Sequence, residues 1–429
     1  MHSTGRGRWA CARVAWLCAC LGIAGPTLAA EPLRLQVLHW WTSAGERKAA
    51  DVLASHLAAE GIQWKDAAIP GGAGLGAAKV LRGRVLAGDA PEVSQMIGVS
   101  IADWAELGLL LEIDGVASAG NWSHVLFPTV DRLVRHRRHV VAAPLGIHRV
   151  NTLFYNVGLL RRHQLQPPRN WEEFERVAQR LQVAGVVALA QSSEPWQVAT
   201  LFENLVLASG GPQLHRDLFV RGSSAVLSDP HLLEALLRLR RMKAWMGRGP
   251  DELPWTELVG RLARGEAAML VMGDWAKGEL LTGGVALDEQ VGCVAMPGTD
   301  SLHLYSVDTL TMFAGDYSHM SGQERMARLL VTPAVQSDYN AAKGSVSVRR
   351  DAEPRRMDSC ARASWQRFAQ GETVQVPSVV HRMATDEVSR DALVAEIHRY
   401  FTNDKVSAQD VQRRMVAIFR ALPPRPLNP

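Results

Sequence analysis

Apolar residues recur along this chain with two different periods. Residues 33–38 alternate between apolar and polar side chains, which predicts a strand. Residues 46–60 instead place apolar side chains at helical spacing, and Gly61 provides a stop. Strand-like and helix-like segments continue to alternate, with further strands expected at 62–69 and 267–272. This alternation predicts an α/β fold with largely parallel sheets.

The length of the chain favours two domains. It has 429 residues, and about 400 residues in the mature form exceed the usual size of a single domain. We expect the chain to pass into the second domain near residues 148–155 and to return at a strand over 305–309. Residues 343–349 form a short link at which the chain crosses again, and residues 360–422 are mainly helical.

Tryptophans stand directly after two of the predicted strands. Trp40 and Trp41 follow the first strand, and Trp275 follows the strand at 267–272. The carboxyl ends of strands are where open α/β sheets bind ligands. An indole offers a flat apolar face and one N–H donor, which suits a sugar ring. Two such turns from different parts of the chain could form opposite walls of one cleft.

Each of these turns also has a purely structural interpretation. Adjacent tryptophans could be core residues, because large aromatic side chains are mostly buried. Ser43 and Glu46 fit a capping box, and Asp274 is placed as the N-cap of the helix that follows it. Asp308 could cap the next segment or accept hydrogen bonds from ligand hydroxyls. We interpret His148 as a hydrogen-bonded interior histidine rather than a ligand-facing donor.

Residues 1–30 have the features of a secretory signal peptide. A basic start is followed by a short apolar core, and small residues suitable for cleavage close the segment. The apolar run is too short to span a bilayer. Residues 17–20 resemble a lipoprotein cleavage box, but Cys18 is unusual inside one, so a lipid anchor at Cys20 is the less favoured alternative. We therefore expect a periplasmic protein.

The charge balance argues against a nucleic-acid partner. The chain has 47 basic and 43 acidic residues, and three of its arginines lie in the signal peptide. The mature protein is thus almost neutral, whereas a nucleic-acid-binding protein needs a basic face. The basic cluster at 135–139 is interpreted as a solvated turn.

Two of the five cysteines remain outside the signal peptide. An exported pair in an oxidising compartment predicts one disulfide, Cys293–Cys360. A metal site would need more soft ligands nearby than the sequence offers. The glycine-rich segment 71–76 has imperfect spacing for a dinucleotide loop, so we interpret it as a surface loop and expect no cofactor.

Several short motifs carry a resemblance to a known family. They are Leu38–Glu46, Pro144 with His148–Asn151, Pro195–Gln197, Met272–Gly278, Val307–Asp308, Lys343–Ser345, and Pro377–Ser378 with His381. With these motifs the chain resembles the glucose/mannose-binding type of periplasmic solute-binding protein of ABC sugar importers, over essentially its whole mature length. No single motif is decisive, but their order and spacing together are specific.

The resemblance implies two α/β lobes, joined by hinge crossovers, that close on a monosaccharide. The N-terminal lobe would comprise residues 31–145 and 302–342, and the C-terminal lobe residues 146–301 and 343–429. The resemblance further implies a protein without catalytic activity that delivers its sugar to the membrane subunits of an ABC permease. We expect a monomer, because nothing in the sequence suggests an obligate dimer.

The resemblance also implies which side chains hold the sugar. One tryptophan of the Trp40–Trp41 pair would stack on the ring, and Trp275 would help to form the opposite wall. Carboxylates accept hydrogen bonds from hydroxyl pairs, while lysine and histidine donate to ring or hydroxyl oxygens. The polar contacts would come from Glu46, Gln95, Asp308, Lys343 and His381.

Ile97 departs from the family pattern. The family usually carries a polar residue, often Lys or His, at this position after Gln95 and Met96. An apolar wall there favours a deoxy, methylated or otherwise altered sugar over strict glucose specificity. Two other functions stay open: a sugar-sensing receptor with the same fold and, less favoured, a secreted glycoside hydrolase with Glu46 and Asp308 as its carboxylate pair.

Overall fold

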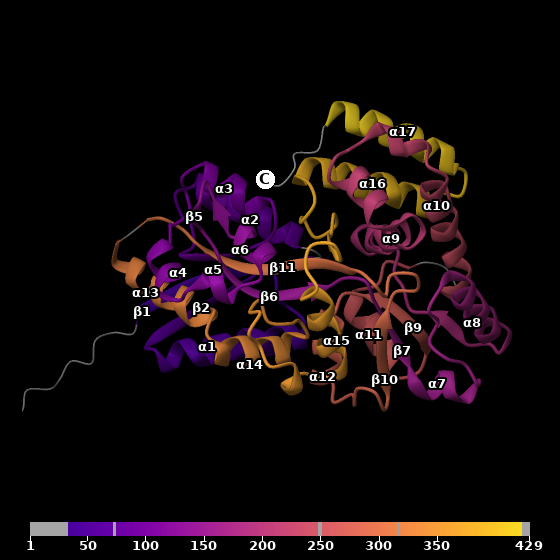
Figure 1. Ribbon diagram of the computed structural model, residues 1–429, viewed down its shortest axis with the longest axis horizontal. Coiled ribbons are helices and arrows are strands. Elements are labelled where there is room, and N and C mark those ends of the chain that lie inside the picture. The colour runs from indigo at the N-terminus through magenta and orange to yellow at the C-terminus, as the bar shows by residue number, and fades with distance from the viewer. Residues whose placement is uncertain (1–32, 72–73, 248–250, 316, 423–429) are drawn as a thin grey trace, which may run out of the picture. The chain divides into compact units, whose positions relative to one another are not determined.

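The computed structural model describes residues 33–71, 74–247, 251–315 and 317–422 (Figure 1). The predicted signal peptide and Cys20 lie outside these residues. Within them the structure has the predicted mixture of helices and strands, arranged around two larger sheets. A small third sheet consists of β4 (Arg135–His136) and β5 (His139–Val140).

The first sheet has six strands. Their order is β12 (Gln375–Pro377), β11 (His303–Met312), β3 (Val93–Met96), β1 (Leu33–His39) and β2 (Ile62–Ala68), and β6 (Ala143–Arg149) also pairs with β11. β1 is parallel to β2 and β3, whereas β11 runs antiparallel to β3 and β6.

The second sheet has four strands. Their order is β10 (Val291–Ala295), β7 (Thr152–Asn156), β9 (Ala267–Met272) and β8 (Val187–Leu189). β7 is antiparallel to both of its neighbours, and β8 is parallel to β9. The prediction of largely parallel sheets was therefore wrong. Both sheets are mixed because β7 and β11 each follow a strand of the other sheet, instead of returning to their own sheet through a helix.

The helices fall into two groups according to the hydrophobic core to which they contribute buried residues. The first core surrounds Val37, Leu145 and Val307, and the second surrounds Phe154, Leu201 and Leu270. The helices of the first core are α1 (Ala44–Ala59), α2 (Leu75–Leu86), α3 (Ser100–Glu106), α4 (Asp114–Ala119), α5 (Trp122–Val125), α6 (Pro128–Leu133), α13 (Tyr317–Leu330), α14 (Pro333–Lys343) and α15 (Ser359–Phe368).

The helices of the second core are α7 (Val157–Arg162), α8 (Trp171–Val183), α9 (Pro195–Phe219), α10 (Pro230–Met242), α11 (Trp255–Ala263), α12 (Trp275–Thr282), α16 (Glu387–Thr402) and α17 (Ala408–Ala421). Short 3-10 turns lie at Ser224–Ser228, Lys243–Trp245 and Pro354–Arg356. No helix in the described part of the chain is both long enough and apolar enough to cross a membrane.

The chain passes between the two sheets after β6 and again before β11. Only residues 150–151 separate β6 in the first sheet from β7 in the second. The predicted boundary between residues 145 and 146 lies inside β6, and the predicted return at residue 302 lies directly before β11. β12, which falls in the predicted C-terminal lobe, pairs with β11 in the first sheet. The lobe boundaries therefore stay predictions, and the strand pairing associates β12 with the first sheet.

Local capping follows the sequence at α1 but not at α12. Ser43 and Glu46 form both bonds of the predicted capping box at the start of α1. Asp274 does stand at the N-cap position of α12, but its side chain makes no capping hydrogen bond. Its carboxylate is engaged elsewhere, because it accepts from the ring of His148 and from the backbone N–H of Arg149.

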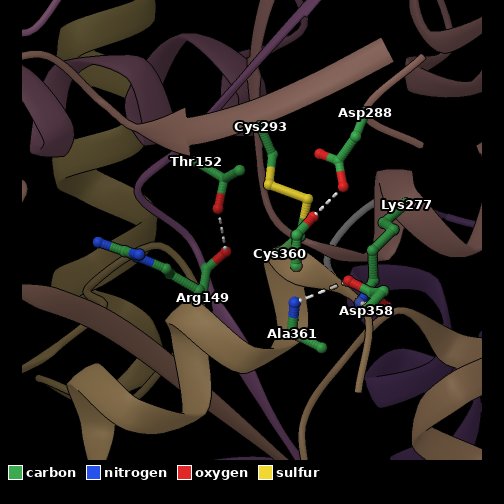
Figure 2. The surroundings of a disulfide bond; sticks show 9 residues. Arg149, Thr152, Lys277, Asp288, Cys293, Asp358, Cys360 and Ala361 are labelled. Atoms are coloured by element: carbon green, nitrogen blue, oxygen red, sulfur yellow. Dashed lines mark hydrogen bonds and ion pairs between the residues drawn. A yellow bond between two sulfur atoms is a disulfide. The ribbon is translucent and has the colours of Figure 1, made fainter. Parts of the chain in front are cut away.

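The predicted disulfide between Cys293 and Cys360 is present, with a Cα–Cα separation of 6.0 Å (Figure 2). It joins β10 of the second sheet to the first turn of α15. Beside it the Lys277 ammonium lies 2.7 Å from the carboxylate of Asp358, the N-cap of α15. Phe368, at the other end of α15, belongs to the first core. The disulfide thus ties the second sheet to a helix that packs against the first core.

Candidate functional site

A cavity of about 440 Å³ is lined by residues from elements of both cores. β1 and β9 each end at it, so the two tryptophan turns predicted from the sequence do meet in one place. The predicted ligand contacts that line this cavity, here called the binding cavity, are Trp40, Glu46, Trp275, Asp308, Lys343 and His381.

The structure separates the two adjacent tryptophans. Trp40 lines the binding cavity, and its ring packs against Gly74, where an added Cβ would lie 2.9 Å from the indole. Trp41 is fully buried in the first core, with its ring 5.9 Å from that of Tyr339. The Lys343 ammonium lies over the aromatic face of Trp41, 6.0 Å from the ring centroid. Trp40 therefore lines the cavity, and Trp41 lies behind it in the first core.

The glycine-rich segment has a place in this wall. Pro70 and Gly71 line the binding cavity, and Gly74 is the residue against which the Trp40 ring rests. Gly74 has a φ of +72°, a conformation that glycine adopts without strain. Residues 72–73 lie outside the described part of the chain. The close approach of backbone to indole gives the glycine a packing role at this position.

Three aromatic rings from the second core and the segment after β12 form another wall. The Trp275 ring lies 5.0 Å from that of His381 and 6.5 Å from that of Trp196. The indole N–H of Trp196 donates to Glu194 at 2.9 Å. Burial, together with the nearby positive charges of Arg390 and His148, lowers the pKa of His381 to about 3, so its ring is neutral at physiological pH.

Lys343 and Glu46 form a partly buried ion pair at the edge of the cavity. The ammonium lies 3.0 Å from Oε1 of Glu46, and the two side chains are 4% and 13% exposed. The other carboxylate oxygen of Glu46 accepts from the backbone N–H groups of Thr42 and Ser43. Glu46 therefore both caps α1 and lines the cavity.

Asp308 is one end of a buried row of charged groups in which His148 lies between two carboxylates. Its carboxylate accepts from Nε2 of His148 at 3.2 Å, and Nδ1 of the same ring donates to Asp274 at 2.6 Å. Burial alone would lower the pKa of His148, but the two carboxylates raise it to about 9. Burial alone would raise the pKa of Asp308, but His148 and Lys343 lower it to about 2. Both groups are therefore charged near neutral pH.

Gln95 reaches the binding cavity only indirectly. It lines a neighbouring cavity of about 370 Å³ instead. Its side-chain amide donates to Asp308 at 3.2 Å, and its carbonyl oxygen accepts from the backbone N–H of Trp40 at 3.2 Å. Gln95 thus orients two cavity residues, while Ile97, two positions further on, lines the cavity itself.

Several other cavity residues were only weakly indicated by sequence pattern. His148 lines the cavity as well as being hydrogen-bonded, and Trp196, Trp255 and Glu194 line it too. Trp275 was identified because it follows a predicted strand, whereas Trp196 and Trp255 stand at the starts of α9 and α11 without a strand directly before them.

The chain matches the family model of bacterial extracellular solute-binding proteins over residues 44–315. A probable sugar-binding periplasmic protein of Brucella suis is 32% identical over 407 residues, which cover 94% of this chain and 96% of that protein. The chain therefore belongs to the family of bacterial extracellular solute-binding proteins. This agrees with the prediction of a binding protein rather than an enzyme.

Solved structures of two solute-binding proteins share the fold. The bacterial solute receptor AcbH, described as having an exclusive preference for β-D-galactopyranose, has a TM-score of 0.77 and 15% identity, covering 91% of this chain and 99% of that one. RafE in complex with raffinose has a TM-score of 0.71 and 19% identity, covering 90% and 99%. At these identities the likeness shows the fold alone.

Proposed function

We propose that this protein captures a monosaccharide, a glucose-like hexose or a modified sugar, and delivers it to the permease of an ABC importer. The coarser part of this function, a periplasmic sugar-binding component of ABC transport, follows from the family and from relatives named as sugar-binding and periplasmic. The signal peptide predicted for residues 1–30 agrees with it.

The observation that carries the proposal is the composition of the binding cavity. Trp40 comes from the first core and Trp275 from the second, and both line it. Aromatic faces bind the apolar C–H face of a pyranose, while hydroxyls at its edge need acceptors and donors. Asp308, Glu46 and Lys343 supply such groups in the same cavity.

Binding between elements of two cores provides a mechanism for signalling occupancy. A sugar that contacts Trp40 and Trp275 together favours the arrangement in which both cores surround it, and so shifts the population toward a closed form. A permease that recognises only this form would accept the loaded protein. Occupancy, rather than chemistry on the sugar, is what the protein transmits.

Charge in the cavity argues against glycoside hydrolysis. A glycosidase needs one carboxylic acid with a raised pKa to protonate the leaving group. The pKa of Asp308 is lowered to about 2, and the Glu46 carboxylate pairs with Lys343. Incubation with aryl glycosides should therefore release no product.

Isothermal titration calorimetry and thermal shift with a broad hexose panel test the proposal. We expect micromolar or tighter binding of at least one hexose, deoxyhexose or methylated hexose, because Ile97 offers an apolar contact. Absence of heat and of any shift across the panel would count against it. A pull-down that recovers a membrane kinase instead of a permease would favour the sensing role.

A further inference from the structure

Glu203 is a buried carboxylate outside the binding cavity that connects to it through one hydroxyl. It lies on α9 and is fully buried. Its carboxylate accepts from the Ser378 hydroxyl at 2.6 Å and from the backbone N–H of Val379 at 2.9 Å. Ser378 directly follows β12 and is also fully buried. Glu203 therefore fixes the segment that leads to His381.

The Ser378 hydroxyl also contacts His381 twice. Its Oγ accepts from the backbone N–H of His381 at 3.2 Å and lies 3.0 Å from ring Nδ1. A hydroxyl has a single proton, and here that proton is donated to a carboxylate, the stronger and closer acceptor. The contact with Nδ1 can then be a hydrogen bond only if Nδ1 carries the proton and donates it to Oγ.

The protonation state of Nδ1 determines that of Nε2, the other ring nitrogen of His381. Because the ring is neutral and its proton lies on Nδ1, Nε2 has a lone pair and no hydrogen. Nε2 has no hydrogen-bond partner among the described residues, and the ring lines the binding cavity beside Trp275. The nitrogen available to a ligand is therefore an acceptor.

We propose that Glu203, acting through Ser378, is a positioning residue that makes His381 an acceptor toward the ligand, so that the cavity selects a sugar with a free hydroxyl at that position. This inference rests on the proposed function and reverses the expectation that His381 donates. Asp308 and Glu46 are acceptors as well, but each already accepts hydrogen bonds from protein donors, whereas Nε2 of His381 has none among the described residues. If the sugar carries a deoxy or methylated carbon, that carbon would then face Ile97 and not His381.

Nuclear magnetic resonance of ¹⁵N-histidine-labelled, unliganded protein tests the tautomer without any sugar. The His381 signals are assigned by their loss in His381→Gln. We expect protonated Nδ1 and unprotonated Nε2. In Glu203→Gln the carboxamide can donate to Ser378, which frees the hydroxyl proton for Nδ1 and shifts the ring toward the Nε2–H form. Protonated Nε2 in the wild type, or a tautomer unchanged in Glu203→Gln, would overturn the proposal.

Calorimetry with D-glucose and its monodeoxy derivatives tests the consequence for selection. In the wild type we expect one derivative to bind at least tenfold more weakly, and in Glu203→Gln we expect that difference to disappear while D-glucose itself weakens by a similar factor. Glu396→Gln is the matched control, since Glu396 is 4% exposed and pairs with Arg399 and Arg414. Glu396→Gln should leave the relative affinities for D-glucose and its monodeoxy derivatives unchanged.

The two experiments fail separately. If no sugar gives heat, the proposed function fails, while the resonances of His381 still decide the tautomer. If sugars bind but Glu203→Gln keeps the wild-type deoxy profile, the positioning role of Glu203 is refuted and the proposed function stands. A circular dichroism melt of each variant establishes that it is folded.

Discussion

The backbone N–H of Gly45 donates to the Glu279 carboxylate at 2.7 Å. Gly45 is in the first turn of α1, and Glu279 lies on α12 of the second core. A Cβ added to Gly45 would lie 2.7 Å from the backbone of Gly278, so the two helices meet backbone to backbone. α1 also carries Glu46, and α12 begins at Trp275. This contact therefore sets how closely two groups of cavity residues approach.

Replacing Gly45 with alanine should weaken sugar binding without unfolding either core. Overpacking of this kind costs typically 1–3 kcal/mol, which corresponds to about tenfold or more in affinity if closure bears the cost. Calorimetry with a bound hexose measures it. Gly83→Ala on α2 is the control, because a Cβ there meets nothing within 4 Å. Equal affinity of Gly45→Ala and Gly83→Ala would show that the contact does not govern closure.

Removing Lys343 should deprive the partly buried Glu46 carboxylate of its ion-pair partner. Breaking such a pair costs about 3–5 kcal/mol, so Lys343→Met should lose on the order of 3 kcal/mol in free energy of unfolding, measured with urea. The double variant Lys343→Met/Glu46→Gln should regain most of that stability but not sugar binding. Lys243→Met removes an exposed pair with Asp404 and should cost less than about 1 kcal/mol. Similar losses for both single variants would contradict this prediction.

The chain of His148 and its two carboxylates predicts a pH dependence of stability. The folded-state pKa of His148 is raised from 6.5 to about 9, so its stabilising contribution is complete below pH 6.5 and is lost as pH rises through 9. The pKa of Asp308 is lowered from 3.8 to about 2, so its contribution is complete above pH 3.8 and is lost as pH falls through 2.

Urea unfolding between pH 6 and 9.5 measures the alkaline side of this dependence. The free energy of unfolding of the wild type should fall across this interval, whereas that of His148→Gln should be lower at pH 6 and should fall less steeply. Parallel curves for the two proteins would show that His148 does not carry the effect.

Reduction of the Cys293–Cys360 disulfide should destabilise the protein. The bond closes a loop with a sequence separation of 67 residues, for which loop entropy predicts about 4 kcal/mol. The variant Cys293→Ser/Cys360→Ser should unfold at lower urea concentration by a corresponding amount, and wild type in reducing agent should match it. An unchanged midpoint in both would contradict the prediction.

Trp40 and Trp41 show how far the sequence could predict the site. The strand–turn–helix pattern located both residues at the end of β1, where the cavity does lie. The alternating apolar pattern ends with the strand, before Trp40 and Trp41. The pattern therefore does not predict which of the two indoles faces the cavity. That choice depends on Tyr339 and Gly74, which contact the two rings from elsewhere in the chain.

His148 and Asp274 show what local reasoning misses. A carboxylate directly before a helix is usually a cap, and a buried histidine is usually hydrogen-bonded, but neither rule identifies a partner that is distant in the sequence. Here the partners of His148 are 126 and 160 positions away. Such pairing depends on the crossovers between the sheets, and sequence pattern carries no information about it. The sequence-based expectation that both sheets are largely parallel failed for the same reason.

Calorimetry of a hexose panel against the wild type, Trp40→Ala and Trp275→Ala tests the central claim most directly, with Trp171→Phe as a control whose ring packs on Phe174 in the second core. We predict that a hexose binds the wild type and Trp171→Phe alike and binds each cavity variant at least tenfold more weakly. Undiminished binding by Trp40→Ala and Trp275→Ala, or no binding by the wild type, would contradict a sugar held between these two indoles.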